Sequence, residues 1–203
     1  MLKRIENADK KTPLLDGLLK KNTVLISGLI VAPVVFVTNT LSNALALIFA
    51  FSVITLFTII ISSFIPRNIV YTIRIILYTI IAALVYVPVY IIEQQLFPDE
   101  VVAMGIMLPL LITNSLILTK AESRFLRQPK GRMVFDLLSY ILGFDAVAIV
   151  IGFIREVFGT GELGGSILGI PLTFPILVYP FGGFILLGLL SALYKKLLSV
   201  FSE

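Results

Sequence analysis

Six long apolar runs, separated by short polar connections, occupy most of this 203-residue chain. The hydrocarbon core of a bilayer is about 30 Å thick, so a helix of roughly 20 apolar residues crosses it. With 58% hydrophobic and 14% charged residues, the composition is typical of a membrane protein. The sequence predicts an all-α polytopic membrane protein with six transmembrane helices, near residues 23–41, 44–65, 69–92, 101–119, 133–154 and 170–194.

The charges between these runs predict the orientation of the chain. Basic residues gather in the tail of residues 1–22, in the second and fourth connections and at the carboxyl end, whereas the third connection is acidic. The positive-inside rule therefore places both termini in the cytoplasm. Leucines at helical spacing among the lysines of the tail favour an interfacial helix, and a solvated tail is an equal alternative.

Two residue types that the sequence lacks limit its chemistry. The chain contains neither cysteine nor histidine, so it offers no disulfide, no zinc site of the usual kind and no thiolate ligand for an iron–sulfur cluster. We therefore expect no metal site in the chain. Its basic residues flank apolar spans, which indicates membrane orientation and not nucleic-acid binding.

A short polar motif occurs twice inside the apolar runs. The sequences "TNTL" from Thr38 and "TNSL" from Thr113 align, and Pro33 and Pro109 then fall within one residue of each other. The copies lie in the first and fourth predicted spans, which cross the membrane in opposite directions. We therefore predict two inverted three-helix repeats, while a chance match between helix caps is the alternative. The repeats would comprise about residues 23–95 and 100–196.

The two prolines predict that the first and fourth helices are broken. Each proline lacks a backbone donor, and we expect the side chains of Asn39 and Asn114 to satisfy the carbonyl groups that this frees. Broken helices often lie where two repeats meet near the bilayer midplane, and a cofactor or ion can bind there. A kink without a binding site is an equal alternative.

Charged side chains also fall inside the predicted spans. Arg74 and Asp136 lie near the cytoplasmic ends of the third and fifth spans, and we expect them to pair with each other, with an ion path as the alternative. Asp145 lies near the middle of the fifth span, where a carboxylate marks either a cation or proton path or a local hydrogen bond. Gly143 and Gly152 are expected to let another helix approach closely.

The stretch "REVFGTGELGG", residues 155–165, is rich in glycine and follows the fifth span. It lacks the strand-before, helix-after context of a nucleotide-binding motif, so we expect a tight re-entrant or capping loop. Its first residues, Arg155 and Glu156, are candidates either for an ion path or for structural pairing.

Several motifs, taken in order, resemble those of one membrane-protein family. They are "LLKKNTVL" (residues 18–25), "APVVFVTNTLSNALAL" (32–47), "PLLITNSLILTKAES" (109–123) and "YPFGGF" (179–184). The family's spacing in the fifth span is matched by Asp136, Ser139, Gly143, Gly152, Arg155 and Glu156. The chain thus resembles the six-helix membrane subunits of the Rnf and Nqr electron-transport complexes, most closely the E-type subunit of Rnf and the D-type subunit of Nqr.

This resemblance implies a membrane complex that couples electron transfer between NAD(H) and ferredoxin or quinone to sodium or proton translocation. It implies a sister subunit of opposite orientation, similar to the A-type subunit of Rnf or the E-type subunit of Nqr, in a prokaryotic cytoplasmic membrane. The chain would then be a non-catalytic membrane subunit, and FMN and iron–sulfur clusters would be bound by its partner subunits.

One departure from the family concerns the cofactor. In the family, each member of the subunit pair supplies two cysteines to a 2Fe–2S cluster at mid-membrane, and the corresponding positions here are Ala32 and Ser115. An alanine methyl group cannot bind iron. We therefore expect no cofactor in this chain, either because the cysteines were engineered away or, as we favour, because the chain is a paralogue that has lost the electron relay.

Two other functions stay open on the residues alone. The first is an inverted-repeat transporter or channel for a cation or small solute, with Asp145 as the coupling carboxylate. The second is a membrane anchor that has no site of its own. A sister six-helix chain and flavin-bearing partners would favour the electron-transport complex over both.

Overall fold

The computed structural model describes residues 17–18, 22–66, 68–169 and 173–201, so the predicted tail helix lies almost wholly outside it. The α-helices are α2 (Val31–Val37), α3 (Leu41–Ser62), α4 (Tyr71–Leu96), α5 (Pro98–Met104), α6 (Ala121–Ser123), α7 (Lys130–Thr160) and α8 (Pro180–Phe201). The short 3₁₀ helices are η1 (Gly105–Met107), η2 (Pro109–Thr113), η4 (Phe125–Arg127) and η5 (Pro175–Leu177), and η3 (Leu116–Lys120) is a π-helix. The strands are β1 (Glu162–Leu163) and β2 (Ser166–Ile167).

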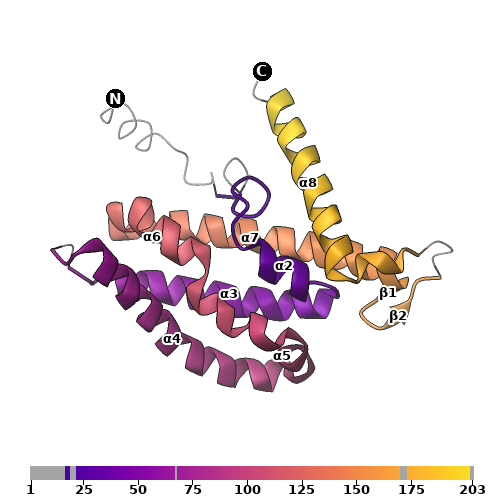
Figure 1. Ribbon diagram of the computed structural model, residues 1–203, viewed down its shortest axis with the longest axis horizontal. Coiled ribbons are helices and arrows are strands. Elements are labelled where there is room, and N and C mark those ends of the chain that lie inside the picture. The colour runs from indigo at the N-terminus through magenta and orange to yellow at the C-terminus, as the bar shows by residue number, and fades with distance from the viewer. Residues whose placement is uncertain (1–16, 19–21, 67, 170–172, 202–203) are drawn as a thin grey trace.

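α3 is the central helix of the bundle and lies between α4 and α7 (Figure 1). In the most apolar window of α3, 50% of the residues are buried, and in α7 the share is 56%, against 17% in α4 and 11% in α8. Phe51 of α3 and Phe144 of α7 pack with their ring centroids 3.9 Å apart. The core therefore lies between α3 and α7, whereas α4 and α8 expose most of their apolar side chains.

The long helices begin and end at residues whose chemistry explains the boundary. The Thr40 hydroxyl accepts a hydrogen bond from the Asn43 N–H at 3.2 Å and so caps α3. α7 ends at Thr160, and the next residue, Gly161, has a φ of 77° and donates its N–H to the Val157 carbonyl. α8 begins with Pro180, which suits the first helical position because the missing N–H would have no helical partner there.

Within the described residues, α3, α4, α7 and α8 are long and apolar enough to cross a membrane. The bent pair Pro98–Met107 and Pro109–Arg127, with 50° between its two parts, adds a fifth span if it is counted as one. A mostly helical chain with several apolar spans and a broken fourth segment is therefore confirmed. The six-helix layout in two inverted repeats is not confirmed at this level.

The first predicted span, residues 23–41, is not a continuous helix. Only α2 is α-helical there, and its seven residues rise about 10 Å, which is too short to cross a bilayer. In the preceding turns, Gly28 and Ile30 have φ values of 64° and 60°. A left-handed residue interrupts a right-handed helix, and a hydrophobicity pattern does not reveal such a residue when it is an isoleucine.

Both glycines singled out in the fifth span permit a close approach. A Cβ atom at Gly152 would lie 2.8 Å from the Cβ of Ala44, so α3 and α7 touch at this point. A Cβ atom at Gly143 would lie 2.5 Å from the Gly17 carbonyl oxygen, and the Asn22 side-chain amide donates to the Gly143 carbonyl at 2.8 Å. The prediction is confirmed at Gly152, whereas the neighbour of Gly143 is a turn and not a helix.

The glycine-rich stretch after the fifth span is only partly a loop. Residues 155–160 are the last turns of α7, and the remainder enters a two-stranded hairpin. In this hairpin Glu162 pairs with Ile167 and Leu163 pairs with Ser166. The tight loop that the glycines predict is therefore present, but it begins later in the chain than expected.

Candidate functional site

Both copies of the Thr-Asn motif lie at interruptions of the helical chain. In the first copy, Thr38 and Asn39 separate α2 from α3. In the second copy, η2 ends at Thr113, and Asn114 is extended, with ψ of 143°, before η3 begins. The motif therefore marks a break in each half, which agrees with the prediction of broken first and fourth segments.

The prolines lie in the first turns of these short helices, and Pro109 directly follows the 50° bend of the fourth segment. Pro33 is the third residue of α2, and Pro109 is the first residue of η2. Backbone N–H groups in the first turn of a helix have no intrahelical partner, so proline removes no helical bond at these positions. The expectation that the prolines interrupt the helical chain is therefore wrong for Pro33, whereas the fourth segment bends by 50° directly before Pro109.

Short-range hydrogen bonds stabilise the first break. The Thr38 hydroxyl donates to the Val34 carbonyl at 2.6 Å, which satisfies a carbonyl near the end of α2. The Asn39 side-chain oxygen accepts from the Asn43 side-chain amide at 2.6 Å. Asn39 thus bonds to another side chain, and not to a freed backbone carbonyl as predicted.

Asn114 stabilises the second break, although the carbonyl that it binds follows Pro109 and is not one that the proline frees. Its amide donates to the Leu111 carbonyl at 3.0 Å and to the Thr55 hydroxyl of α3 at 3.2 Å, and its oxygen accepts from the Ile117 N–H at 2.9 Å. Thr113 makes a weaker bond, from its hydroxyl to the Leu110 carbonyl at 3.3 Å. Asn114 is only 5% exposed, so these bonds lie inside the protein and fix the break against α3.

Arg155 joins three segments through backbone carbonyl groups. Its guanidinium donates to the Val35 carbonyl of α2 at 2.7 Å, to the Leu177 carbonyl of η5 at 2.8 Å and to the Val178 carbonyl at 2.8 Å. The side chain is fully buried. A Cβ atom at Gly183 would lie 3.3 Å from Arg155 Cζ, so the glycine leaves room for the guanidinium.

Glu156 completes what we term the Arg155–Glu156 brace. One of its carboxylate oxygens accepts from the Leu41 N–H, the first residue of α3, at 2.7 Å. The other accepts from the Gly164 N–H of the hairpin turn at 2.8 Å. A carboxylate at a helix amino terminus also interacts favourably with the helix dipole. The brace therefore holds the first break from the α7 side.

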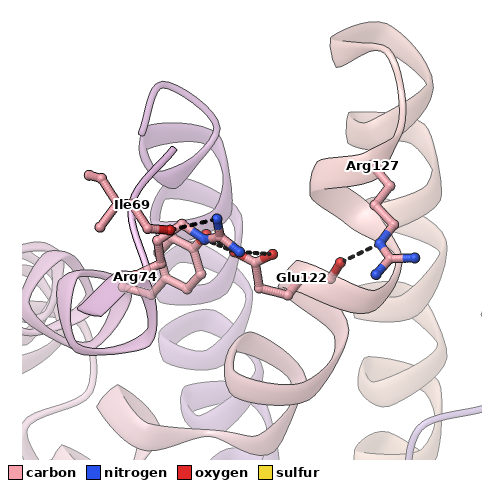
Figure 2. A network of polar contacts seen from close by, with 5 residues as sticks. Ile69, Arg74, Glu122 and Arg127 are labelled. Atoms are coloured by element: carbon pink, nitrogen blue, oxygen red, sulfur yellow. Dashed lines mark hydrogen bonds and ion pairs between the residues drawn. The ribbon is translucent and has the colours of Figure 1, made fainter. Parts of the chain in front are cut away.

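Arg74 and Asp136 do not pair with each other, in contrast to the prediction. Figure 2 shows Arg74 facing Glu122, with its Nε atom 2.8 Å from a carboxylate oxygen, and the Ile69 carbonyl accepting from the same guanidinium at 2.9 Å. Tyr78 donates a further hydrogen bond to Glu122. Arg74 thus connects the start of α4 to the fourth segment of the chain.

Asp136 has its own partners on the same fourth segment. Arg124 binds its two carboxylate oxygens at 2.6 and 2.7 Å, and the Gln128 amide donates at 3.0 Å. The sequence alone could not separate these pairings, because residues 120–132 were expected to be the connection after the fourth span. In the structure the fourth helical segment continues through α6 and η4 to Arg127 and supplies both counter-charges.

Asp145 lies half-buried near the middle of α7 and faces α3. The Ser52 hydroxyl lies 3.1 and 3.2 Å from its two carboxylate oxygens and donates to them. Ser52 was not singled out from the sequence, since one serine in an apolar helix gives no signal of its partner. A carboxylate can accept several hydrogen bonds, so one hydroxyl leaves most of its acceptor capacity free. This arrangement is compatible with binding of a cation or a proton by Asp145.

Glu93 is a second intramembrane carboxylate, and the sequence placed it wrongly in the connection after the third span. The structure places it inside α4, fully buried, and neither carboxylate oxygen has a hydrogen-bond partner among the described residues. It shares the buried face of α4 with Tyr78, Ala82 and Val89. These four residues recur at helical spacing, and this periodicity could have identified Glu93 as part of the buried face of α4.

The positions that correspond to the family's cluster ligands do not fit an iron–sulfur cluster. Ala32 lies exposed on α2, and Ser115 lies half-buried just before η3. Alanine has no donor atom, and the chain has no cysteine or histidine that could replace it. Among the described residues, no group of three or more His, Cys, Asp or Glu side chains could hold a metal ion.

Comparison with known proteins adds an independent line of evidence. The family described as "Rnf-Nqr subunit, membrane protein" matches residues 11–191. A protein of Shewanella amazonensis, named as the E-type subunit of an ion-translocating oxidoreductase complex, is 34% identical over 192 residues, which cover 87% of this chain and 82% of the relative. Its namesake in Shewanella oneidensis is 31% identical over 192 residues, covering 87% and 83%. The protein of the same name from Haemophilus ducreyi is 31% identical over 166 residues, which cover 79% of this chain and 73% of the relative.

Proposed function

Since the chain belongs to the Rnf-Nqr family of membrane subunits, we propose that it is an integral membrane subunit of an Rnf-type ion-translocating oxidoreductase complex. The observation that carries this proposal is the family match over residues 11–191, together with relatives named as the E-type subunit of such a complex. A free-standing transporter or channel is not favoured, because these relatives are named as subunits of an oxidoreductase.

The experiment that tests this proposal is purification of the tagged chain from its native membrane in mild detergent. We expect flavin-bearing subunits and a second membrane chain of the same family to copurify with it. A chain that is isolated alone, or only with soluble ATPase subunits, would exclude the proposal.

We further propose that residues 23–95 and residues 100–196 form two inverted repeats when the chain lies in the complex. Support comes from the two Thr-Asn breaks, each of which interrupts the first segment of one half. The basic tail and carboxyl end support a position in a prokaryotic cytoplasmic membrane with both termini in the cytoplasm. Cysteine labelling from either side of the membrane, in a chain that has no native cysteine, tests the orientation without background.

The electron route is proposed to bypass this chain, because Ala32 offers no ligand atom to iron. Iron analysis and electron paramagnetic resonance of the purified complex test this. A reducible 2Fe–2S signal that is lost when Ser115 is replaced by alanine would overturn the proposal. The double substitution Ala32→Cys and Ser115→Cys is the matched gain-of-function variant, and it should raise the iron content if a sister subunit supplies two thiolates.

A role in ion passage rests on the two intramembrane carboxylates. Asp145 has one hydroxyl partner and Glu93 has none among the described residues, although each lies inside a span where an ionised carboxylate requires compensation. We propose that these side chains contact the translocated cation or proton. Asp145→Asn and Glu93→Gln should each slow ion uptake by the complex in reconstituted vesicles, and unchanged uptake in both would remove this role.

A further inference from the structure

Ser52 of α3 and Asp145 of α7 face each other at the border of the interface between these two helices. The Ser52 hydroxyl oxygen lies 3.1 and 3.2 Å from the two carboxylate oxygens of Asp145, and both residues are half-buried. A phenylalanine precedes each of them, and the rings of Phe51 and Phe144 pack with their centroids 3.9 Å apart. This aromatic contact fixes α3 against α7 at the level of the pair, so the three oxygen atoms are held close together without a ligand.

The helices that carry this pair supply no counter-charge for Asp145. α3 contains no charged residue. The nearest arginine along α7 is Arg155, and its guanidinium binds three backbone carbonyl groups. The next carboxylate of the same helix, Asp136, is bound by Arg124. An ionised carboxylate inside a span needs a compensating charge, so the charge that balances Asp145 comes from a mobile ion.

The serine hydroxyl adds a second kind of oxygen to the carboxylate. Hard metal cations take oxygen ligands, and oxygens that bind one such cation at roughly 2.3–2.6 Å lie about 3–3.5 Å apart. The Ser52 oxygen has this separation from both oxygens of Asp145. A proton bonds to one carboxylate oxygen and needs no second ligand. Because both residues are half-buried, water can complete the coordination of a metal cation.

We propose that Ser52 is a second ligand of the translocated ion, beside Asp145, and that the pair selects a monovalent metal cation such as sodium over a proton. The inference rests on the proposed role of Asp145 in ion passage. When the cation binds, the Ser52 hydroxyl turns its hydrogen away from the carboxylate and offers a lone pair of its oxygen. The pair carries one negative charge, so a monovalent cation neutralises it inside the span, whereas a divalent cation leaves a net positive charge there.

The test measures uptake of radioactive sodium by the whole complex in reconstituted vesicles, at fixed pH and over a range of sodium concentrations. Ser52→Ala removes the hydroxyl oxygen and leaves the carboxylate in place. We expect this variant to raise the sodium concentration for half-maximal uptake by about tenfold, because one interaction with a charged group is lost. The maximal rate should stay nearly unchanged, whereas a folding defect lowers the maximal rate at every sodium concentration.

Ser63→Ala is the matched control, because Ser63 directly follows α3 and its hydroxyl donates to the Ile60 carbonyl at 2.6 Å. This control should keep the sodium dependence of the unmodified complex, and so should Ser52→Thr, which retains a hydroxyl. Equal sodium dependence of Ser52→Ala and Ser63→Ala would overturn the inference. Uptake that is independent of sodium, while a pH-sensitive dye inside the vesicles reports proton entry, would overturn it as well.

Asp145→Asn separates this inference from the proposed function. If Asp145→Asn slows uptake but Ser52→Ala leaves the sodium dependence unchanged, the inference about Ser52 fails and the role of Asp145 stands. If Asp145→Asn leaves uptake unchanged, that role and the inference fail together. Membership of the oxidoreductase complex is tested by copurification, and none of these results affects it.

Discussion

Replacement of Arg155 by methionine is the most direct test of the Arg155–Glu156 brace. Methionine keeps most of the length and the apolar stem of arginine but removes the guanidinium. The carbonyl groups of Val35, Leu177 and Val178 then lose the donor that lies 2.7 to 2.8 Å away. Because Arg155 is fully buried, water does not simply replace it.

Two opposing contributions determine the size of the effect. A buried carbonyl without a donor costs about 1–3 kcal/mol, and three carbonyls are affected. Removal of a buried charge recovers several kcal/mol of desolvation energy, and hydrogen bonds between membrane helices average only about 0.6 kcal/mol. We therefore expect a net loss of about 2–5 kcal/mol in the free energy of unfolding, or roughly 5–15 °C in Tm for a chain of this length.

The assay must suit a chain that contains neither tryptophan nor cysteine. Tryptophan fluorescence and thiol-reactive dyes give no signal, so the measurement is the temperature at which half of the monodisperse peak in size-exclusion chromatography is lost after heating. Arg132→Met is the control, because Arg132 is an exposed arginine in the first turn of the same helix. If the two variants lose their peaks within about 2 °C of each other, the brace contributes no stability and the reasoning is refuted.

Three further predictions concern the other polar groups of the bundle. Asn114→Ala should lower the free energy of unfolding by about 1–3 kcal/mol, because the Leu111 carbonyl loses its side-chain donor, and the same heating assay measures this. In a double-mutant cycle, Arg124→Ala and Asp136→Ala should show a coupling energy of about 1–3 kcal/mol, and a coupling near zero would mean that the pair is not formed in the membrane. Glu93→Met should raise the unfolding temperature, since it removes a buried carboxylate that has no partner among the described residues, at a gain of about 1–3 kcal/mol; a lower temperature would show that Glu93 has a stabilising partner.

The membrane class and the long spans could be predicted from the sequence, because hydrophobic length and charge asymmetry are properties of single segments. The pairing of charged side chains could not be predicted in this way. Arg74 and Asp136 are the nearest opposite charges in a span-by-span reading. In the structure they pair with Glu122 and Arg124 instead, because the fourth helical segment continues to Arg127. That extension depends on tertiary packing and leaves no periodic pattern in the sequence.

Among the residues of the candidate site, the sequence indicated where the helical chain is interrupted more reliably than which groups bond there. The Thr-Asn copies were expected at helix breaks and lie there, since asparagine and threonine compete with the backbone for hydrogen bonds. The prolines were assigned the breaking role. The 50° bend directly before Pro109 agrees with this, whereas Pro33 lies in the first turn of α2, and the sequence does not show where such a short helix starts. Glu93 was missed because the apolar run ends at Ile92 and two glutamines follow it, whereas α4 continues to Leu96.

The bonds made by Arg155 have a consequence for how this family can change over time. All three of its acceptors are main-chain atoms, so these hydrogen bonds do not depend on which side chains occupy positions 35, 177 and 178, as long as the backbone keeps its path. Pairwise covariation between these positions and position 155 should therefore be absent, even though the contacts hold three segments together. The single residue type that the brace demands of its surroundings is the small one at Gly183, where any larger side chain would compete with the guanidinium for space.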